Sequence, residues 1–346
     1  MADSAGGSPA PVRSVAHRRA FEDAVLPVEG HLPAFDGATG WLHSEPLTPA
    51  GLRGRVVLVD FWTYTCVNWL RTLPYVRAWA DRYAEQGLTV VGVHTPEFGF
   101  ERDIDNVTRE AAGFGVGYPV AVDNGYRVWT AFANHFWPAI YVADGDGRIR
   151  YHHFGEGEYV MTEMAIQQLL GEAGRIVDPE LVTVHPTGLE VAADWATLRS
   201  PETYLGHRQT TGFASVRHLV PDAVAEYPPA GRLALNHWAP TGSWSIASHA
   251  AVLAEPKGRI AFRFQARDVN LVMGPAVRGS AVGFRIFLDG EPVTTSEGAD
   301  VGPDGTGIAA TQRTYQLLRQ RGAIAERTFE IEFLDAGIEA YCFTFG

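Results

Sequence analysis

The sequence predicts two domains, an α/β domain followed by an all-β antiparallel sandwich. The first observation is that apolar segments alternate with segments of helical periodicity up to about residue 176, which is typical of α/β architecture. The second is that beyond this point Gly and Pro turns separate short strands of alternating polarity, as in antiparallel sheets. The third is the length of 346 residues, which exceeds what one hydrophobic core usually serves.

The α/β domain begins with three well-marked segments. Residues 55–62 form a continuous apolar run after Gly54 and predict a strand buried on both faces. From Cys66 to about Tyr83, apolar residues recur at spacings of three and four, which predicts an amphipathic helix. Residues 88–94 predict a second buried strand. The remaining expected elements are a helix over 103–114, a strand over 118–122, a helix over 126–132, hairpin strands over 139–142 and 149–154, and a helix over 159–173.

The second half is predicted from strands whose side chains alternate between two faces. The clearest examples are residues 259–264, 282–288 and 329–333, each of which follows the period of two. We therefore expect a flexible N-terminal tail over residues 1–25, an α/β domain over 26–176, and a linker with a β-sandwich over 177–346.

Composition and charge exclude several classes of protein. The formal net charge is −12, which makes nucleic acid and anionic membrane surfaces poor partners. No run of 18 apolar residues occurs, and the first twenty residues lack the apolar core of a secretory signal, so we expect a cytoplasmic protein. The two cysteines lie in different expected domains, which excludes a disulfide framework. His152 and His153 are neighbours on a strand and point to opposite faces, and we expect neither a metal nor a cofactor.

Cys66 is the candidate reactive residue. It is predicted at the first turn of the helix that follows the buried strand, with Thr65 as the N-cap. There the helix dipole and the unpaired backbone N–H groups favour negative charge and stabilise the thiolate. Cysteines in such places have pKa values of about 3.5–7.5 instead of about 8.5, and the thiolate is the attacking species. A small buried apolar side chain is the alternative interpretation.

Four sequence segments carry a resemblance to a known family. They read F-W-T-Y-T-C-V-N-W-L-R-T-L-P at 61–74, H-T-P-E-F-G-F-E at 94–101, N-H-F-W-P-A-I-Y at 134–141 and H-H-F-G-E-G-E-Y at 152–159. They resemble the C-terminal region of DipZ-type proteins, within the TlpA/ResA group of thioredoxin-like redoxins. The resemblance covers most of residues 26–346. It implies a thioredoxin fold in the first domain, a carbohydrate-binding-module-like sandwich in the second, and a cis Pro138 facing Cys66.

The sequence departs from this family at the second cysteine of its C-x-x-C motif, because position 69 is Trp69. A tryptophan cannot resolve a mixed disulfide, and Cys342 on an apolar terminal strand is expected to be buried. Three alternatives follow. Cys66 forms a mixed disulfide or sulfenic acid that an external low-molecular-weight or protein thiol resolves; or the chain is a one-cysteine peroxidase, since Thr63 matches a T-x-x-C pattern; or it is a redox-inactive binding protein. The interpretation favours a thiol-dependent oxidoreductase.

Further residues are candidates around Cys66 and in the second domain. Glu97 follows a strand end and is a candidate proton acceptor near the sulfur. Trp62, Trp137 and Thr65 are candidates for contacting a substrate, the tryptophans as an aromatic rim together with Trp69. Arg71 is expected on the helix surface and Glu156 and Glu158 in a solvated turn. In the sandwich, a glycan is a candidate partner, with Asn236, Trp238, Trp244 and residues 267–270 as candidate contacts.

Overall fold

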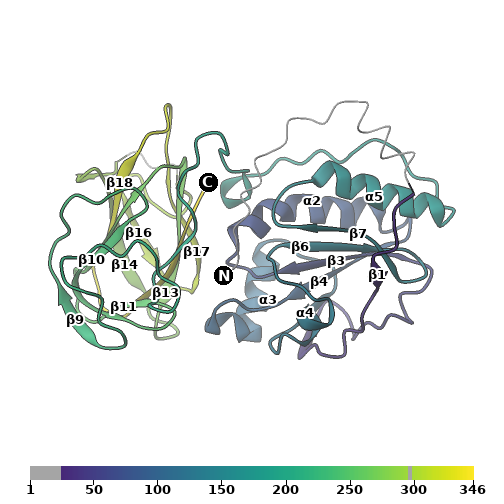
Figure 1. Cartoon of the computed structure of the whole chain (residues 1–346), viewed down its shortest axis with the longest axis horizontal. Helices are drawn as coiled ribbons and strands as arrows, with labels where there is room; N and C mark the ends of the chain where they lie inside the picture. Colours follow the sequence, from purple (N-terminus) through teal and green to yellow (C-terminus); the bar gives the residue numbers. More distant parts are fainter. Residues whose placement is uncertain (1–24, 295–297) are drawn as a thin grey trace. The chain divides into compact units, whose positions relative to one another are not determined.

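The structure is a computed structural model that describes residues 25–294 and 298–346, and it divides into two compact units between Glu190 and Val191 (Figure 1). The expected tail therefore lies outside the described residues except for Val25. Residues 177–190, expected as part of a linker, belong to the first unit because Val177, Val182 and Leu189 pack against its core. Among the helices of the described part, none is long and apolar enough to cross a membrane.

The first unit is built on a seven-stranded mixed sheet. The central strand β3 pairs in parallel with β4 and antiparallel with β6, and every residue of β3 is buried, as its apolar sequence predicts. In sheet order the strands are β1 (Gly30–His31), β7 (Arg148–Phe154), β6 (Ala139–Ala143), β3 (Val56–Trp62), β4 (Leu88–His94), β5 (Val120–Val122) and β2 (Gly40–Leu42).

Helices cover both faces of this sheet. Side chains of α2, α3 and α5 join one core cluster with Leu58 and Trp62 of β3, whereas α4 packs with Phe61 on the other face. Figure 1 shows α2 and α5 running side by side along the sheet. The helices are α2 (Val67–Tyr83), α3 (Ile104–Gly113), α4 (Arg127–Ala131) and α5 (Tyr159–Glu172), with short 3-10 turns η1 (Gly99–Arg102) and η2 (Gly188–Glu190).

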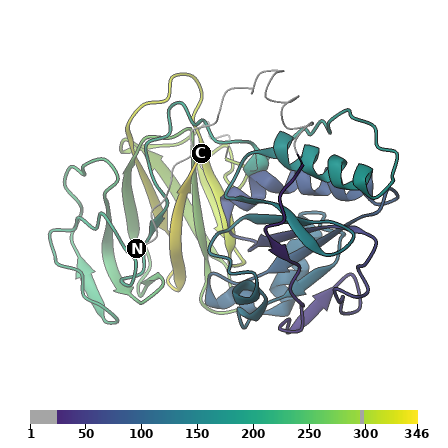
Figure 2. The ribbon, with the colours of Figure 1, turned by 45° about the vertical axis from the view of Figure 1, so that its right-hand side comes forward.

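The second unit is an all-β curled sheet, and Figure 2 shows its strands from a second direction. Its strands are β8 (Thr203–Tyr204), β9 (Val224–Tyr227), β10 (Trp238–Ile246), β11 (Ala251–Leu253), β12 (Arg259–Phe264), β13 (Asp268–Pro275), β14 (Val282–Leu288), β15 (Glu291–Pro292), β16 (Thr306–Ala309), β17 (Arg313–Arg319), β18 (Arg327–Phe333) and β19 (Ile338–Phe345).

Strand β10 makes the sheet curl into two facing layers. Residues 238–241 of β10 pair with β12, and residues 242–246 pair with β9 and β11. The second set begins at Gly242, which has a φ of +96°, a conformation that favours glycine. The layers meet through aromatic rings, since the ring centroids of Phe262 in β12 and Phe343 in β19 lie 5.2 Å apart. All the named strand pairs of this unit are antiparallel, so the predicted fold class, α/β followed by antiparallel all-β, is confirmed.

Candidate functional site

Cys66 lies where β3 has ended and α2 begins. It is the N-cap residue of α2 in an extended conformation, with φ −71° and ψ 109°. Its backbone N–H donates to Thr63 O at 3.2 Å, and its carbonyl accepts from the N–H of Leu70 at 3.0 Å. The thiol is half-buried and forms no disulfide with Cys342. Cys66 therefore stands, half-buried, at the N-terminal end of α2, where the unpaired backbone N–H groups of a helix favour negative charge.

The predicted N-cap role of Thr65 is wrong. The helix begins one residue later than expected, and the Thr65 side chain turns into the interior, where its hydroxyl donates to Glu101 Oε1 at 2.6 Å. A carboxyl oxygen is a strong acceptor for a buried hydroxyl, which accounts for this orientation. Thr65 is 1% exposed, so it does not fit the predicted role of contacting a substrate.

Glu101 was not among the predicted site residues. It lies in η1, is wholly buried, and accepts from the backbone N–H groups of Glu97 at 2.6 Å and Phe98 at 2.8 Å through Oε2. Burial raises its pKa, and the hydrogen bonds that it accepts act in the opposite direction. A carboxyl side chain that reaches back three residues to a helix N-cap is a known sequence pattern, and F-G-F-E at 98–101 matches its spacing.

The segment before β6 brings a backbone carbonyl to the Cys66 sulfur. The Trp137–Pro138 peptide bond is cis, and Pro138 O accepts from Gly155 N at 2.8 Å, which ties this segment to the end of β7. Cys66 Sγ lies 3.8 Å from Trp137 O, a distance compatible with a weak S–H hydrogen bond. Trp137 is half-buried, and its ring centroid lies 4.3 Å from that of Trp129. The structure thus brings Cys66, Trp137 and Pro138 together.

The expected aromatic rim does not include Trp62 or Trp69. Both side chains are fully buried, with stacked rings whose centroids lie 4.3 Å apart between the sheet and α2. Trp62 ends a strand that is buried along its length, and Trp69 lies on the inner face of α2, so neither ring reaches a substrate. Trp69 Nε1 donates to Asp60 Oδ2 at 3.0 Å, a contact that no sequence pattern indicated.

Two buried ionisable groups lie next to this tryptophan pair. Burial raises the pKa of Asp60 to about 7, although hydrogen bonds from Trp69 and from the Tyr118 hydroxyl, 3.4 Å away, act to lower it. Burial lowers the pKa of His94 to about 3, and the His94 ring packs edge-on against Trp62 with centroids 4.8 Å apart. His94 is therefore neutral at pH 7, and the Asp60 carboxyl titrates near that pH.

Arg71 and Glu156 were expected at the surface, but the structure buries both side chains. Their side chains are 3% and 6% exposed and form an ion pair with Nη1 and Oε2 3.4 Å apart. The residues are 85 positions apart in the sequence, so spacing alone did not indicate the pair. Tyr159, which follows the same turn, stacks on Tyr75 of α2 with centroids 3.8 Å apart. These contacts fasten the end of β7 to α2.

The predicted role of Glu97 as a proton acceptor near the Cys66 sulfur stays a prediction. Glu97 is half-buried in the loop after β4, and its backbone N–H donates to Glu101.

In residues 25–294 and 298–346, no group of three or more His, Cys, Asp or Glu side chains is arranged to hold a metal ion.

Most of the candidate glycan contacts of the second unit lie inside it, whereas Asn236 and Arg267 are half-buried. Trp238 and Trp244 are fully buried, and Asp268 and Asn270 are 2% and 1% exposed. Glycan sites need exposed aromatic faces, so Trp238 and Trp244 do not form one. Their inward direction follows from the strand alternation of β10. The predicted burial of Cys342 is confirmed, since it is 1% exposed on β19.

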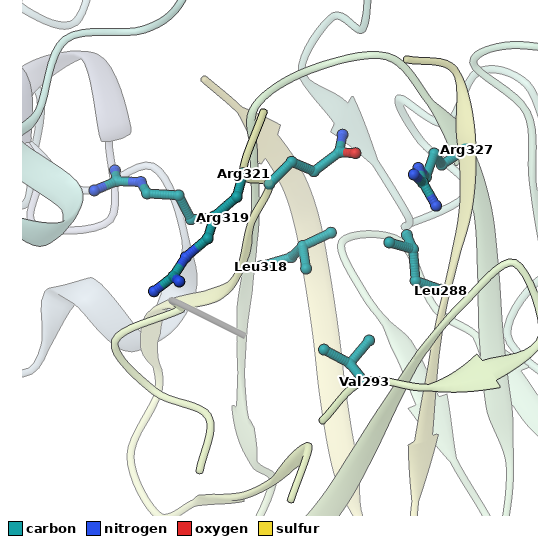
Figure 3. A pocket seen from close by; sticks show the side chains of 7 residues that line it. Leu288, Val293, Leu318, Arg319, Arg321 and Arg327 are labelled. Carbon is teal, nitrogen blue, oxygen red and sulfur yellow. The ribbon is translucent and has the colours of Figure 1, made fainter. Parts of the chain in front are cut away.

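A cavity of about 200 Å³ opens on the second unit (Figure 3). Two of its arginines pair with carboxylates: Arg319 Nε lies 2.6 Å from Asp268 Oδ1, and Arg327 Nη1 lies 3.1 Å from Asp289 Oδ2. These pairs neutralise much of the positive charge that an anionic ligand would need. The lining residues are Leu288, Val293, Leu318, Arg319, Gln320, Arg321 and Arg327.

The sheet order, the cysteine at the start of α2 and the cis-proline segment beside it define the first unit as a thioredoxin-like domain. A family model described as "Thioredoxin like C-terminal domain" matches residues 200–346, which make up most of the second unit. The two units are thus a thioredoxin-like domain and a separate all-β domain.

Several proteins are similar to this chain. The DipZ proteins of Mycobacterium bovis and Mycobacterium tuberculosis are 34% identical to it over 324 residues, which is 92% of this chain and 43% of each of those proteins. The chain thus spans less than half their length. Thiol-disulfide oxidoreductase YkuV of Bacillus subtilis is 29% identical over 141 residues, 41% of this chain and 95% of that protein. A solution structure of a thioredoxin-like protein in the oxidised form shares 29% identity, covers 42% of this chain and 97% of its own, and has a TM-score of 0.39.

Proposed function

We propose that this chain is a thiol redox protein that acts through a single nucleophilic cysteine, Cys66. The observation that carries the proposal is a half-buried thiol at the N-terminus of α2, 3.8 Å from Trp137 O. Relatives named as thiol-disulfide oxidoreductases, YkuV at 29% identity and ResA of Halalkalibacterium halodurans at 25%, support redox chemistry at this place. The buried indole of Trp69 supports a cycle without an internal resolving thiol.

The proposed cycle has two exchange steps. The Cys66 thiolate attacks one sulfur of a partner disulfide, so that a Cys66–partner disulfide forms and the other partner sulfur leaves as a thiolate, which takes a proton from water. The thiolate of an external thiol then attacks the partner sulfur. This step releases Cys66 as a thiolate and oxidises the external thiol to a disulfide with the partner. Each step breaks one disulfide and forms another, so the cycle needs no further oxidant or reductant.

An exposed aromatic pair supports a polypeptide as the partner. Phe136 and Phe154 are 43% and 38% exposed, and their rings stack with centroids 5.0 Å apart. Phe136 directly precedes Trp137, whose carbonyl lies at the Cys66 sulfur. Large apolar rings in solvent mark contact surfaces, and a polypeptide disulfide offers side chains to cover them, whereas a small disulfide offers little. We therefore favour a polypeptide disulfide over a low-molecular-weight disulfide as the partner that Cys66 attacks.

The peroxidase alternative has less support. It relied on Thr63, whose side chain is wholly buried and thus unsuited to meet a peroxide at the sulfur. The alternative of a redox-inactive binding protein predicts that Cys66→Ser leaves binding partners unchanged. The alternative of glycan binding lost its aromatic candidates, because Trp238 and Trp244 are buried.

Alkylation of the native full chain tests the proposal. We expect iodoacetamide to modify Cys66 with a pH profile whose midpoint lies well below about 8.5, the value of an ordinary thiol. Cys342→Ser is the matched control and should react like the wild type, while Cys66→Ser should not react. A midpoint at or above the ordinary thiol value, or no adduct on the native protein, refutes the proposal.

Exchange with a peptide disulfide tests the single-cysteine cycle. A Cys66–peptide adduct should accumulate in the intact-mass spectrum, because the chain lacks a resolving thiol near it, and added dithiothreitol should release the peptide. Hydrogen peroxide provides the comparison: rapid sulfenic acid formation with slow peptide exchange would favour the peroxidase instead.

A further inference from the structure

We propose that Glu101 is the positioning residue for Cys66 and that it acts through the hydroxyl of Thr65. The inference rests on the proposed function, since it concerns how the same thiol is held. The juxtaposition behind it is a wholly buried carboxyl bonded to the residue immediately before the nucleophile.

One carboxyl group joins two segments that lie far apart in the sequence. Oε1 accepts from the hydroxyl of Thr65, which comes after β3, at 2.6 Å. Oε2 accepts from the backbone N–H groups of Glu97 and Phe98, which come after β4, at 2.6 and 2.8 Å. The carboxyl ends of the parallel strands β3 and β4 meet at one edge of the sheet, so Glu101 ties together the two loops that follow them.

The chemistry of the side chain argues against simple space filling. Moving a carboxyl from water into the interior costs free energy, whereas a Leu or Met of similar size would fill the space at no such cost. Three donors converge on Glu101 and compensate that cost. Such a network specifies one arrangement of the groups around it, because any displacement leaves a buried polar atom without its partner.

The arrangement that it specifies is the turn that carries the thiol. The turn comprises residues 63–66. The Thr65 hydroxyl is bonded to Glu101, and Cys66 N donates to Thr63 O at 3.2 Å, so these two hydrogen bonds fix the turn. The Cys66 sulfur is then placed at the start of α2 and 3.8 Å from Trp137 O. Because the Thr65 hydroxyl is bonded to Glu101, it does not cap α2, and the thiolate is left to meet the positive end of the helix.

Two substitutions at Thr65 test the link without altering the carboxyl. Thr65→Val removes the hydroxyl and keeps the shape, and Thr65→Ser keeps the hydroxyl. We expect Thr65→Val to slow alkylation of Cys66 in the full chain about tenfold at pH 7 and to raise the midpoint of its pH profile, because the loss of one hydrogen bond loosens the turn. Thr65→Ser should react within about twofold of the wild-type rate, because the serine hydroxyl can donate the same hydrogen bond to Glu101.

Glu101→Gln tests the carboxyl itself. The amide replaces one accepting oxygen with an N–H₂ donor and so cannot accept from both loops. If Thr65 acts through Glu101, the double variant with Thr65→Val should react no more slowly than the slower single variant. Glu110→Gln is the matched control, since Glu110 is 9% exposed on the neighbouring helix α3 and pairs with Arg109. It should react like the wild type.

The outcomes separate this inference from the proposed function. A wild-type protein whose Cys66 is unreactive refutes the proposed function and the inference with it. A reactive wild type with unchanged pH profiles in Thr65→Val and Glu101→Gln refutes the inference alone. The inference is also refuted if both variants lower only the thermal unfolding midpoint, because that is the result of a purely structural role.

Discussion

The indole N–H of Trp69 donates a 3.0 Å hydrogen bond to Oδ2 of Asp60 inside the thioredoxin-like domain. Trp69 therefore does more than replace a cysteine, because its ring stacks on Trp62 and its N–H serves a buried carboxyl. The bond couples α2, which begins directly after Cys66, to the central strand β3. Changes at either residue should thus alter both stability and the titration of Asp60.

Trp69→Phe should raise the pKa of Asp60 above its value of about 7, because the indole N–H is one of the groups that lower it. The variant should also lose about 1–3 kcal/mol of unfolding free energy through the lost hydrogen bond. Carboxyl NMR titration and urea unfolding measure the two effects. Trp79→Phe is the control: Trp79 is equally buried on α2, and its Nε1 has no hydrogen-bond partner among the described residues. An unchanged Asp60 titration in Trp69→Phe would contradict the prediction.

Asp60→Asn should change how stability depends on pH. The pKa of Asp60 is about 7 in the folded chain against 3.8 for the ordinary carboxyl, so between these values the folded state binds a proton that the unfolded state does not. Stability from this group is therefore present at low pH and lost as the pH rises to 7. Asparagine removes the loss, and relative to the wild type it should gain stability up to the order of 4 kcal/mol above pH 7.

Urea unfolding at pH 5 and pH 8 measures this gain, and Asp144→Asn provides a control of opposite sign. Burial acts to raise the pKa of Asp144, but hydrogen bonds from groups that include Arg148 and Arg150 outweigh it and the net pKa is lowered. Asp144→Asn should therefore lose stability at neutral pH. Equal pH slopes in Asp60→Asn and the wild type would show that Asp60 does not titrate in this window.

His94→Phe should make the chain more resistant to acid. The pKa of His94 is about 3 in the folded chain against 6.5 for the ordinary imidazole, so the unfolded state binds a proton first as the pH falls. Stability from this group is complete above pH 6.5 and is lost between 6.5 and about 3. Phenylalanine keeps an aromatic ring at this position and removes the titratable imidazole. Thermal unfolding at pH 5 and pH 7.5 should show a smaller difference for the variant, and the exposed His135→Gln should behave like the wild type.

The sequence predicted the main elements around the site because their signals are local. Residues 56–62 are apolar except for Asp60, residues 67–83 carry a helical repeat, and both elements formed within a few residues of the expected bounds. Cys66 was recognised for the same reason, since its place depends only on where one strand ends and one helix starts.

The contacts that hold the site were not predictable in this way. Thr65 was expected to cap the helix, yet its hydroxyl binds Glu101, which is 36 positions away, and Arg71 binds Glu156 over 85 positions. Neither pairing leaves a periodic trace in the sequence. The tryptophans were uncertain for another reason: a large amphipathic ring at a strand end fits both a core and a rim, and only packing decides between them.

Gly92→Ala should destabilise the first unit by about 1–3 kcal/mol through overpacking. A Cβ at Gly92 would lie 2.8 Å from Trp62 Nε1 and 3.0 Å from Tyr118 Cε2, so the buried tryptophan pair would have to shift. Gly113→Ala is the matched control, because a Cβ there meets no atom within 4 Å. Thermal unfolding should distinguish the two variants. If Gly92→Ala matches the control, the packing around Trp62 has more room than these contacts indicate.

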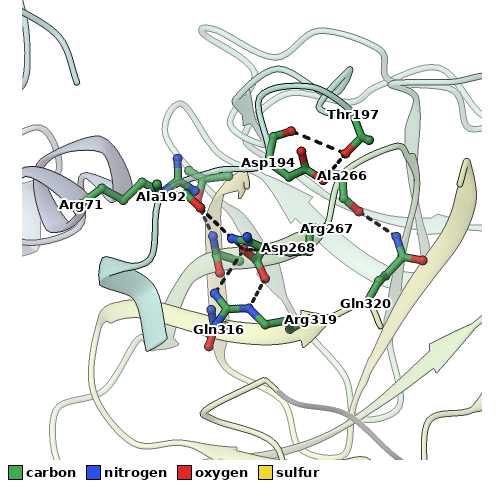
Figure 4. Close-up of polar contacts among 12 residues, drawn as sticks. Arg71, Ala192, Asp194, Thr197, Ala266, Arg267, Asp268, Gln316, Arg319 and Gln320 are labelled. Carbon is green, nitrogen blue, oxygen red and sulfur yellow. Dashed lines mark hydrogen bonds and ion pairs between the residues drawn. The ribbon is translucent and has the colours of Figure 1, made fainter. Parts of the chain in front are cut away.

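Asp268→Asn should destabilise the second unit strongly. Asp268 is 2% exposed and pairs with two arginines, with Oδ1 2.6 Å from Arg319 Nε and Oδ2 2.6 Å from Arg267 Nη2 (Figure 4). Loss of its charge leaves two partly buried guanidinium groups without their counter-ion, a change that costs about 3–5 kcal/mol in buried pairs. Asp289→Asn breaks the more exposed pair with Arg327 and should cost about 0–1 kcal/mol. Urea unfolding followed by tryptophan fluorescence, with Trp238 and Trp244 buried in this unit, measures both variants. A loss of similar size in the two would mean that burial does not strengthen the Asp268 pairs.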